Sequence, residues 1–303
     1  IYMKDEFSRF HPTINFIYFA AVITFSTIYM NPILLSISFI SGLIYSIYLD
    51  GRKSFRFNLL TILPISIFAA LVNIAFNHNG MTILCYLPTG NPVTLESIIY
   101  GICAAVLLSN IIIWFFCFSR IITSDKFIYL FGKIIPSLSL VLSMIIRFIP
   151  LFKHQYQAVS TAQKTLTYNN KNNKITSKIK HSLNIFSIML TWSLENSIIT
   201  ADSMNSRGYG LKGRTAFSNY KFYFRDGIAL IILAALIITL IFLTFVGYAD
   251  IVFYPFYELN ITGIGIVGYI IYAGLCILPM IINITEDMNG IIFGQRFKLF
   301  IYK

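Results

Sequence analysis

The chain has 303 residues, of which 57% are hydrophobic and only 12% are charged, and its mean hydropathy is +0.74. Soluble globular proteins carry about 25% charged residues. The composition therefore excludes a soluble globule and predicts an all-α, polytopic membrane protein. Its net charge is +11, and the positions of the basic residues indicate how its membrane spans are oriented.

The cysteines and histidines indicate neither a metal site nor a disulfide framework. Cys85, Cys103, Cys117 and Cys276 form no C-x-x-C pair and lie mostly in apolar runs, so we interpret them as small hydrophobic residues. The four histidines are scattered, and no metal-binding residues are expected. The opening stretch IYMKDEFSRFHPTINF has charges ahead of its first apolar run and no small-residue cleavage site after it, so we expect no signal peptide.

Six apolar runs are long enough to cross a bilayer, which takes ~20 helical residues. They cover residues 13–30, 32–49, 58–77, 97–119, 227–247 and 263–283. A seventh run, Ile134–Phe152, contains Arg147 and is bounded by Pro136 and Pro150. Whether it also crosses the membrane is decided by charge.

Lysine and arginine concentrate in cytoplasmic loops. With six spans and a cytoplasmic N-terminus, the outer connections are Asn31, Asn77–Glu96 and Tyr248–Thr262, and none of them contains a lysine or an arginine. A seventh crossing at Ile134–Phe152 would put the lysine-rich stretch after it outside. We therefore expect this run to lie along the inner leaflet with its proline-bounded ends at the interface, and both termini to face the cytoplasm.

This topology predicts three parts of the chain. Residues 1–119 form an N-terminal membrane domain of four spans. Residues 120–226 form a cytoplasmic and inner-leaflet module of helices. Residues 227–303 form a membrane hairpin of two spans, followed by a tail.

A long helix is predicted at the end of the module, after the flexible linker NNKNNK. Thr176 or Ser177 is expected to N-cap it, and Gly208 or Gly210 to end it after about Arg207. Its apolar stripe, spaced by three and four residues, comprises Ile179, Leu183, Phe186 and Leu190. Past Trp192 the stripe continues as Ser193, Ser197, Thr200, Ala201 and Met204. Small residues let another helix cross closely. The pattern fits either a helix packed on its own protein or a platform for another hydrophobic membrane protein.

The stretch LTWSLENSIITADSMNSRGYGLKGRT resembles the transmembrane T component of energy-coupling factor (ECF) transporters, the EcfT or CbiQ-like family. In that family a coupling helix ends in Ala-Arg-Gly, often within A-x-x-M-x-A-R-G-Y. The matching residues are Ala201, Met204, Ser206, Arg207, Gly208 and Tyr209, with Ser206 in place of alanine. Thr123–Phe152 and the AQK sequence at Ala162–Lys164 are similar to the family's other coupling helices. A second Ala-Arg-Gly, expected just after AQK, is missing, because the chain reads Thr-Leu-Thr there.

The resemblance implies a coupler between two cytoplasmic ABC ATPase subunits and a membrane-embedded S component that binds a vitamin or metal ion. The implied location is the prokaryotic plasma membrane. No cofactor is expected on this chain, since ATP belongs to the ATPases, and no nucleic-acid partner is expected. The implied ATPase-docking residues are Ser206, Arg207, Gly208 and Tyr209, with Gln163 and Lys164 in place of the missing motif. The implied S-component platform comprises Pro136, Met144, Phe186, Leu190, Ser197 and Ala201.

Arg207 suits docking chemically. Its guanidinium offers five donors in a rigid fork that can engage a carboxylate, and Gly208 lets a partner backbone approach closely. The alternative is a helix-end charge favoured by the dipole, worth ~0.3 to 1 kcal/mol. Glu195 and Asp202 share one helical face and pair either with the module's own lysines or with a partner.

The sequence lacks the residues that an ATPase, a secondary transporter or an intramembrane enzyme would need. The chain has no G-x-x-x-x-G-K-[ST] phosphate loop, so it is not expected to be an enzyme that hydrolyses ATP. A secondary transporter needs ionisable residues inside its spans, and the six runs contain none apart from their ends. An intramembrane enzyme needs a gathered set of catalytic groups, which the carboxylates do not form. The GIGIVG sequence at Gly263–Gly268 opens an apolar helix with no strand before it, so close helix packing is expected there.

Overall fold

The computed structural model describes residues 5–86, 92–132, 136–167, 175–209, 220–249, 251, 253–254 and 263–301. These residues are mostly helical, with one two-stranded antiparallel hairpin. In chain order the elements are η1 (Phe7–Arg9), α1 (Pro12–Ile28), α2 (Pro32–Asp50), α3 (Arg52–Phe57), η2 (Asn58–Ile62), α4 (Leu63–Phe76), β1 (Ile83–Tyr86), β2 (Pro92–Thr94), α5 (Leu95–Ile121), α6 (Ser124–Gly132), α7 (Pro136–Thr167), α8 (Ile175–Ser206), α9 (Phe224–Phe245) and α10 (Gly263–Ile301).

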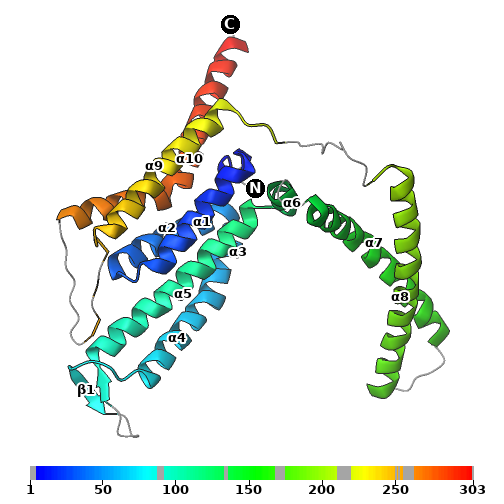
Figure 1. Cartoon of the computed structure of the whole chain (residues 1–303), viewed down its shortest axis with the longest axis horizontal. Coiled ribbons are helices and arrows are strands. Elements are labelled where there is room, and N and C mark those ends of the chain that lie inside the picture. Colours follow the sequence, from blue (N-terminus) through cyan, green and yellow to red (C-terminus); the bar gives the residue numbers. More distant parts are fainter. Residues whose placement is uncertain are drawn as a thin grey trace. The chain divides into compact units, whose positions relative to one another are not determined.

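The chain forms two compact units. Unit 1 comprises residues 1–127 with 220–303, and unit 2 comprises residues 128–219. Unit 1 holds the bundle of long apolar helices, and unit 2 holds α7 and α8 (Figure 1). The three-part division predicted from the sequence, with boundaries after residues 119 and 226, stays a prediction.

Five helical segments within the described residues are long and apolar enough to cross a membrane: Pro32–Asp50, Arg52–Phe76, Leu95–Ile121, Phe224–Phe245 and Gly265–Thr285. The apolar helix α1 has only 17 residues. Apolar helices therefore occupy all six predicted positions, and five of them reach full spanning length. The all-α, polytopic membrane fold is confirmed. The second segment runs through α3, the π-helical turn η2 and α4 without a break.

The bundle of unit 1 is held by aromatic packing and by buried hydrogen bonds between helices. Trp114 of α5 is fully buried and donates from Nε1 to Ser38 Oγ of α2, at 2.9 Å. The Tyr18 hydroxyl of α1 donates to the Cys276 carbonyl of α10, at 3.2 Å. At the ends of α2 and α5, Arg120 forms an ion pair with Asp50 at 2.6 Å. Because membrane helices gain no hydrophobic free energy from each other, such packing and polar contacts specify the bundle.

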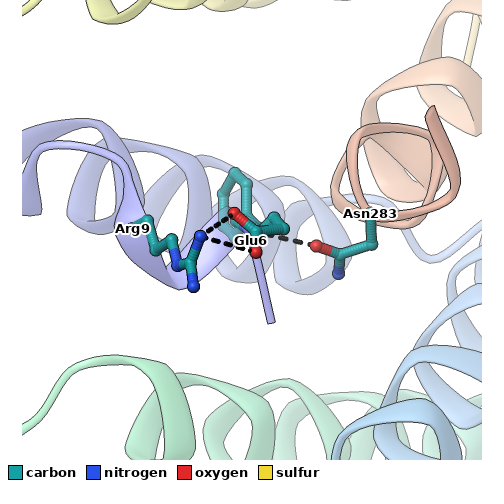
Figure 2. A network of polar contacts seen from close by, with 4 residues as sticks. Glu6, Arg9 and Asn283 are labelled. Atoms are coloured by element: carbon teal, nitrogen blue, oxygen red, sulfur yellow. Dashed lines mark hydrogen bonds and ion pairs between the residues drawn. The ribbon is translucent and has the colours of Figure 1, made fainter. Parts of the chain in front are cut away.

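The segment before α1 is fastened to the distant helix α10. The buried Asn283 side chain accepts from the Phe7 backbone N–H at 3.0 Å and donates to the Asp5 carboxylate at 2.7 Å. Figure 2 shows Asn283 reaching this segment beside the Glu6–Arg9 ion pair, whose atoms are 2.8 Å apart. One amide side chain of α10 therefore joins this helix to the segment before α1.

The prediction for α7 was wrong at its second proline. The helix begins at Pro136 as expected, but Pro150 lies inside it and the helix continues to Thr167. A proline inside a helix removes one backbone hydrogen bond and is tolerated where packing offsets the cost. The predicted N-caps are also wrong, because α8 already begins at Ile175. The linker NNKNNK and Gly210 lie outside the described residues.

Two further features concern the connections between spans. The predicted outer connection Asn77–Glu96 contains the hairpin β1–β2, which the all-α expectation did not include.

The prediction of close packing at GIGIVG is confirmed, because a Cβ added to Gly268 would lie 2.4 Å from the Tyr248 ring. Only a glycine lets α10 pass Tyr248 this closely.

Candidate functional site

The predicted docking residues form the C-terminal end of α8. The Gly208 N–H donates to the Asn205 carbonyl at 3.0 Å, and the Tyr209 N–H donates to the Met204 carbonyl at 3.1 Å. Gly208 has φ +73°. This pairing is the Schellman motif, in which a left-handed glycine closes the helix and satisfies its last carbonyls. Gly208 is therefore confirmed as the helix stop.

Arg207 is the last residue before the left-handed turn, and its side chain is exposed. Among the residues that the structure describes, no carboxylate forms an ion pair with it. Ser206 is also exposed, and its hydroxyl donates back to the Asp202 carbonyl at 2.9 Å. The turn therefore fixes the Arg207 backbone and leaves its side chain exposed at the end of the helix.

Gln163 and Lys164 lie at the C-terminal end of the other long helix, α7. Lys164 is exposed and Gln163 is half-buried. Beside them is a shallow depression of about 510 Å³, lined by His154, Gln157, Ala158, Thr161, Ala162 and Thr165. The basic residue in the last turn of α7 is favoured by the helix dipole, and the two long helices of unit 2 each end in a positive charge.

The two helix ends do not come together. α8 has 32 residues, which makes it ~48 Å long, and its start follows α7 in the chain. Figure 1 shows α7 and α8 crossing, and the Ser206–Tyr209 turn lies at the end of α8 remote from its start. The rings of Phe152 and Trp192 meet where the helices cross, with centroids 5.2 Å apart. The C-terminal ends of the two helices therefore lie apart.

The predicted apolar stripe of α8 is exposed. Phe186 and Leu190 expose 62% and 45% of their surface, and Ser197 and Ala201 are exposed farther along the helix. On α7, Met144 is half-buried, and Pro136 is placed only by its backbone. In a membrane protein an exposed apolar face of this size contacts either lipid or another protein.

A groove of about 1020 Å³ follows this stripe, between α8 and the middle of α7. Its lining comprises Phe152, Lys153, Tyr156, Lys178, Ile179, Ser182, Leu183, Ile185, Phe186, Met189, Leu190, Ser193 and Leu194. The lining is mainly apolar, and among the described residues that form it the charged side chains are those of Lys153 and Lys178. Phe186 and Leu190, predicted for the platform, therefore lie in the groove together.

Sequence reasoning missed part of this face. Leu194, Ile198 and Ile199 are all at least 60% exposed, and they extend the apolar surface beyond Leu190. The prediction followed the small residues past Trp192 instead. Steps of four from Leu190 reach Leu194 and Ile198, so the same spacing rule, continued without interruption, would have found them.

Neither the acidic side chains nor a metal cluster adds to the site. Within the described parts of the chain, Glu195 and Asp202 form no ion pair, and no three histidine, cysteine, aspartate or glutamate side chains are grouped to hold a metal ion. The groups that the structure does present are an exposed guanidinium on a rigid turn, a second basic helix end and an apolar face.

The model of one protein family, CbiQ, described as a cobalt transport protein, matches residues 4–217. The match covers more than half of the 303 residues and includes both helix ends and the groove. The chain belongs to the CbiQ family. The resemblance seen in the motif around Arg207 is thus confirmed, and this CbiQ family member has a transport role. A search of curated proteins finds no match.

Proposed function

We propose that this CbiQ family member is the T component of an ECF-type importer in a prokaryotic plasma membrane. It couples two cytoplasmic ABC ATPases to an S component that carries the vitamin or metal ion. The observation that carries the proposal is the turn Ser206–Tyr209, which presents an exposed Arg207 at the end of a 32-residue helix within the family match. ATP binds to the ATPases, and this chain itself has no catalytic role.

Two features of unit 2 support a coupling role. First, the helix ends at Lys164 and Arg207 are separate, as attachment to two ATPases requires. Second, the exposed stripe and the groove offer an S component a large apolar surface. A membrane-embedded partner that binds this surface exchanges lipid contacts for protein contacts. Because lipid tails and helix faces are similarly apolar, its association depends on close packing of side chains.

The proposed orientation places both termini in the cytoplasm and unit 2 on the cytoplasmic side of the membrane, along the inner leaflet and in the cytoplasm. It is supported by the basic residues, since the outer connections predicted from the sequence contain no lysine or arginine. ATPases are available only on that side of the membrane, so orientation and docking support the same function.

The test is Arg207→Glu in the complete transporter. Loss of a buried, hydrogen-bonded charge contact costs ~2 to 5 kcal/mol, whereas the helix-end dipole contributes at most ~1 kcal/mol. We expect the variant to reach the membrane normally but to lose its ATPases in pull-down and to lose substrate uptake. Because the chain has only one Ala-Arg-Gly-like motif, the loss should exceed that of Lys164→Glu.

Lys180→Glu is the matched control, since Lys180 is an exposed cation near the other end of the same helix. It should keep the ATPases. If Arg207→Glu retains its ATPases and transports as the wild type does, Arg207 is only a helix-end charge and the proposed docking role is wrong.

A further inference from the structure

The hairpin β1–β2 carries an exposed apolar edge that the coupling function does not use. All four residues of β1 are exposed. Ile83, Leu84 and Tyr86 expose 49%, 58% and 67% of their surface, and the neighbouring Met81 exposes 63%. The partner strand β2 is different, because Val93 and Thr94 are buried. One strand therefore packs on the protein, and the other presents apolar side chains outward.

Charge restricts what can cover this edge. Residues 77–95 contain no aspartate, glutamate, lysine or arginine. Edge strands exposed to water are normally protected by charges, since their free N–H and C=O groups would otherwise recruit other strands. In water, an apolar edge strand without charged residues would promote aggregation. We therefore infer that this strand is not exposed to bulk water.

The hairpin is fixed to the start of α5 and cannot move far from it. β2 leads directly into α5, and the Leu95 N–H donates to the Thr82 carbonyl at 3.0 Å. The Thr94 hydroxyl donates to the Asn79 carbonyl at 2.6 Å, and the Ser97 hydroxyl donates to the Asn77 carbonyl. These bonds hold both sides of the connection between α4 and α5 against the helix end.

Helix length places that helix end within the bilayer. α5 has 27 residues, or ~40 Å at 1.5 Å per residue, whereas the bilayer with its headgroups is ~40 to 45 Å thick. With the Arg120 end of α5 at one membrane surface, the other end lies in the headgroup layer of the opposite leaflet. Tilting the helix only draws this end deeper.

The backbone of β1 restricts more closely how deep this strand can lie in the bilayer. An edge strand in hydrocarbon would leave its N–H and C=O groups without partners, at several kcal/mol each. In the headgroup layer water reaches these groups, while apolar side chains dip toward the acyl chains. Tyr86 suits that depth, because tyrosine is enriched at membrane interfaces.

We propose that β1 is a lipid-contacting anchor, lying at the boundary between headgroups and acyl chains on the membrane surface opposite the Arg120 end of α5. Its partner is the phospholipid bilayer itself, and Met81, Ile83, Leu84 and Tyr86 make the contact. The exposed end of α4, at Phe76, continues the same lipid-facing surface. The anchor sets how deeply the α4–α5 pair sits in the membrane.

Cys85 provides a native probe, because it lies in β1 and is exposed, whereas Cys103, Cys117 and Cys276 are buried. The full chain, labelled at Cys85 with an environment-sensitive fluorophore, is reconstituted without partners into phosphatidylcholine–phosphatidylglycerol vesicles. Fluorescence is quenched by lipids carrying a nitroxide near the headgroup, by lipids carrying it deep in the acyl chain, and by aqueous iodide. We expect the shallow nitroxide to quench most strongly.

Two variants that add the same charge sharpen the test. Leu84→Asp should reduce quenching by the shallow nitroxide severalfold and increase quenching by iodide. Asn79→Asp, at an exposed polar position of the same connection, should change neither. The proposal is overturned if iodide dominates in the wild type, if the deep nitroxide dominates, or if Leu84→Asp leaves the pattern unchanged. None of these outcomes bears on ATPase docking, so the anchor and the coupling function are tested separately.

Discussion

Lys126 shows how a single cation fastens the N-terminal segment to the beginning of α6. Its side chain is buried, and its ammonium group donates to the carbonyl and hydroxyl oxygens of Ser8 and to the Ile121 carbonyl. Burial lowers the pKa of Lys126 to about 8, although the nearby Asp5 carboxylate acts in the opposite direction. Burial likewise raises the pKa of Asp5.

The lowered pKa of Lys126 predicts a specific pH dependence of stability. In the unfolded chain the lysine keeps its proton up to about pH 10.4, whereas in the folded protein it loses the proton near pH 8. The unfolded state therefore binds more protons between these values, and stability rises with pH across that window. Relative to Lys126→Met, the wild type should gain thermal stability from about pH 8 to pH 10.

Thermal unfolding of the detergent-solubilised protein at a series of pH values measures this difference. Lys180→Met, at an exposed position of α8, is the control. A wild-type curve that stays parallel to the Lys126→Met curve across the window would show that the ammonium group is not desolvated as described.

Close approach between α10 and the end of α9 depends on glycine. The end of α9 closes with Gly247 at φ +80°, which turns the chain so that Tyr248 packs against Gly268 of α10. A side-chain carbon at position 268 would lie 2.4 Å from Cδ2 and 2.6 Å from Cε2 of that ring. Tyr248 is itself buried, so the ring has little space into which it can move.

Gly268→Ala should therefore destabilise unit 1 by about 1 to 3 kcal/mol, the usual cost of overpacking a filled interior. Gly274→Ala, in the same helix, is the matched control, because an added Cβ there meets nothing within 4 Å. It should be neutral or stabilising by up to ~1 kcal/mol through helix propensity. Melting temperatures of the two variants decide the point, and equal values for both would refute the packing argument.

The two termini and unit 2 are predicted to lie on the cytoplasmic side. In a Cys85→Ser background, a cysteine at Asn172 should be protected from a membrane-impermeant maleimide in intact cells, and a cysteine at Asn79 should react. Opening the cells should make the first site reactive. Labelling of Asn172→Cys from outside would invert the topology and remove the basis for docking cytoplasmic ATPases.

Much of the whole fold was predictable, because hydrophobic length alone identifies membrane helices. The predicted spans 97–119 and 227–247 differ by a few residues from Leu95–Ile121 and Phe224–Phe245. The helix stop at Gly208 was predictable for a similar reason, since glycine tolerates the left-handed conformation that ends a helix. Both signals are local in the sequence.

The features that sequence reasoning missed depend on contacts between distant residues. Nothing near Phe7 indicates that its backbone binds Asn283. The hairpin was missed because β1 has only four residues, ILCY, and shows no alternation of polar and apolar side chains. Pro150 was taken as a helix end, but the 32-residue helix α7 continues through it, although an interior proline removes a hydrogen bond and its ring crowds the carbonyl four residues earlier. A long-range contact, a four-residue strand and a proline tolerated inside a long helix are each invisible to local sequence patterns.

Pro150 also has a mechanical consequence for α7. Its missing N–H leaves the Ile146 carbonyl without the usual helical partner, and it lies two residues before Phe152, which contacts Trp192 at the crossing. The bending stiffness of α7 is therefore lowest next to the point where it crosses α8. We therefore expect α7 to bend more readily beside Pro150 than elsewhere along its length, which would let the angle between α7 and α8 change without unfolding a helical turn.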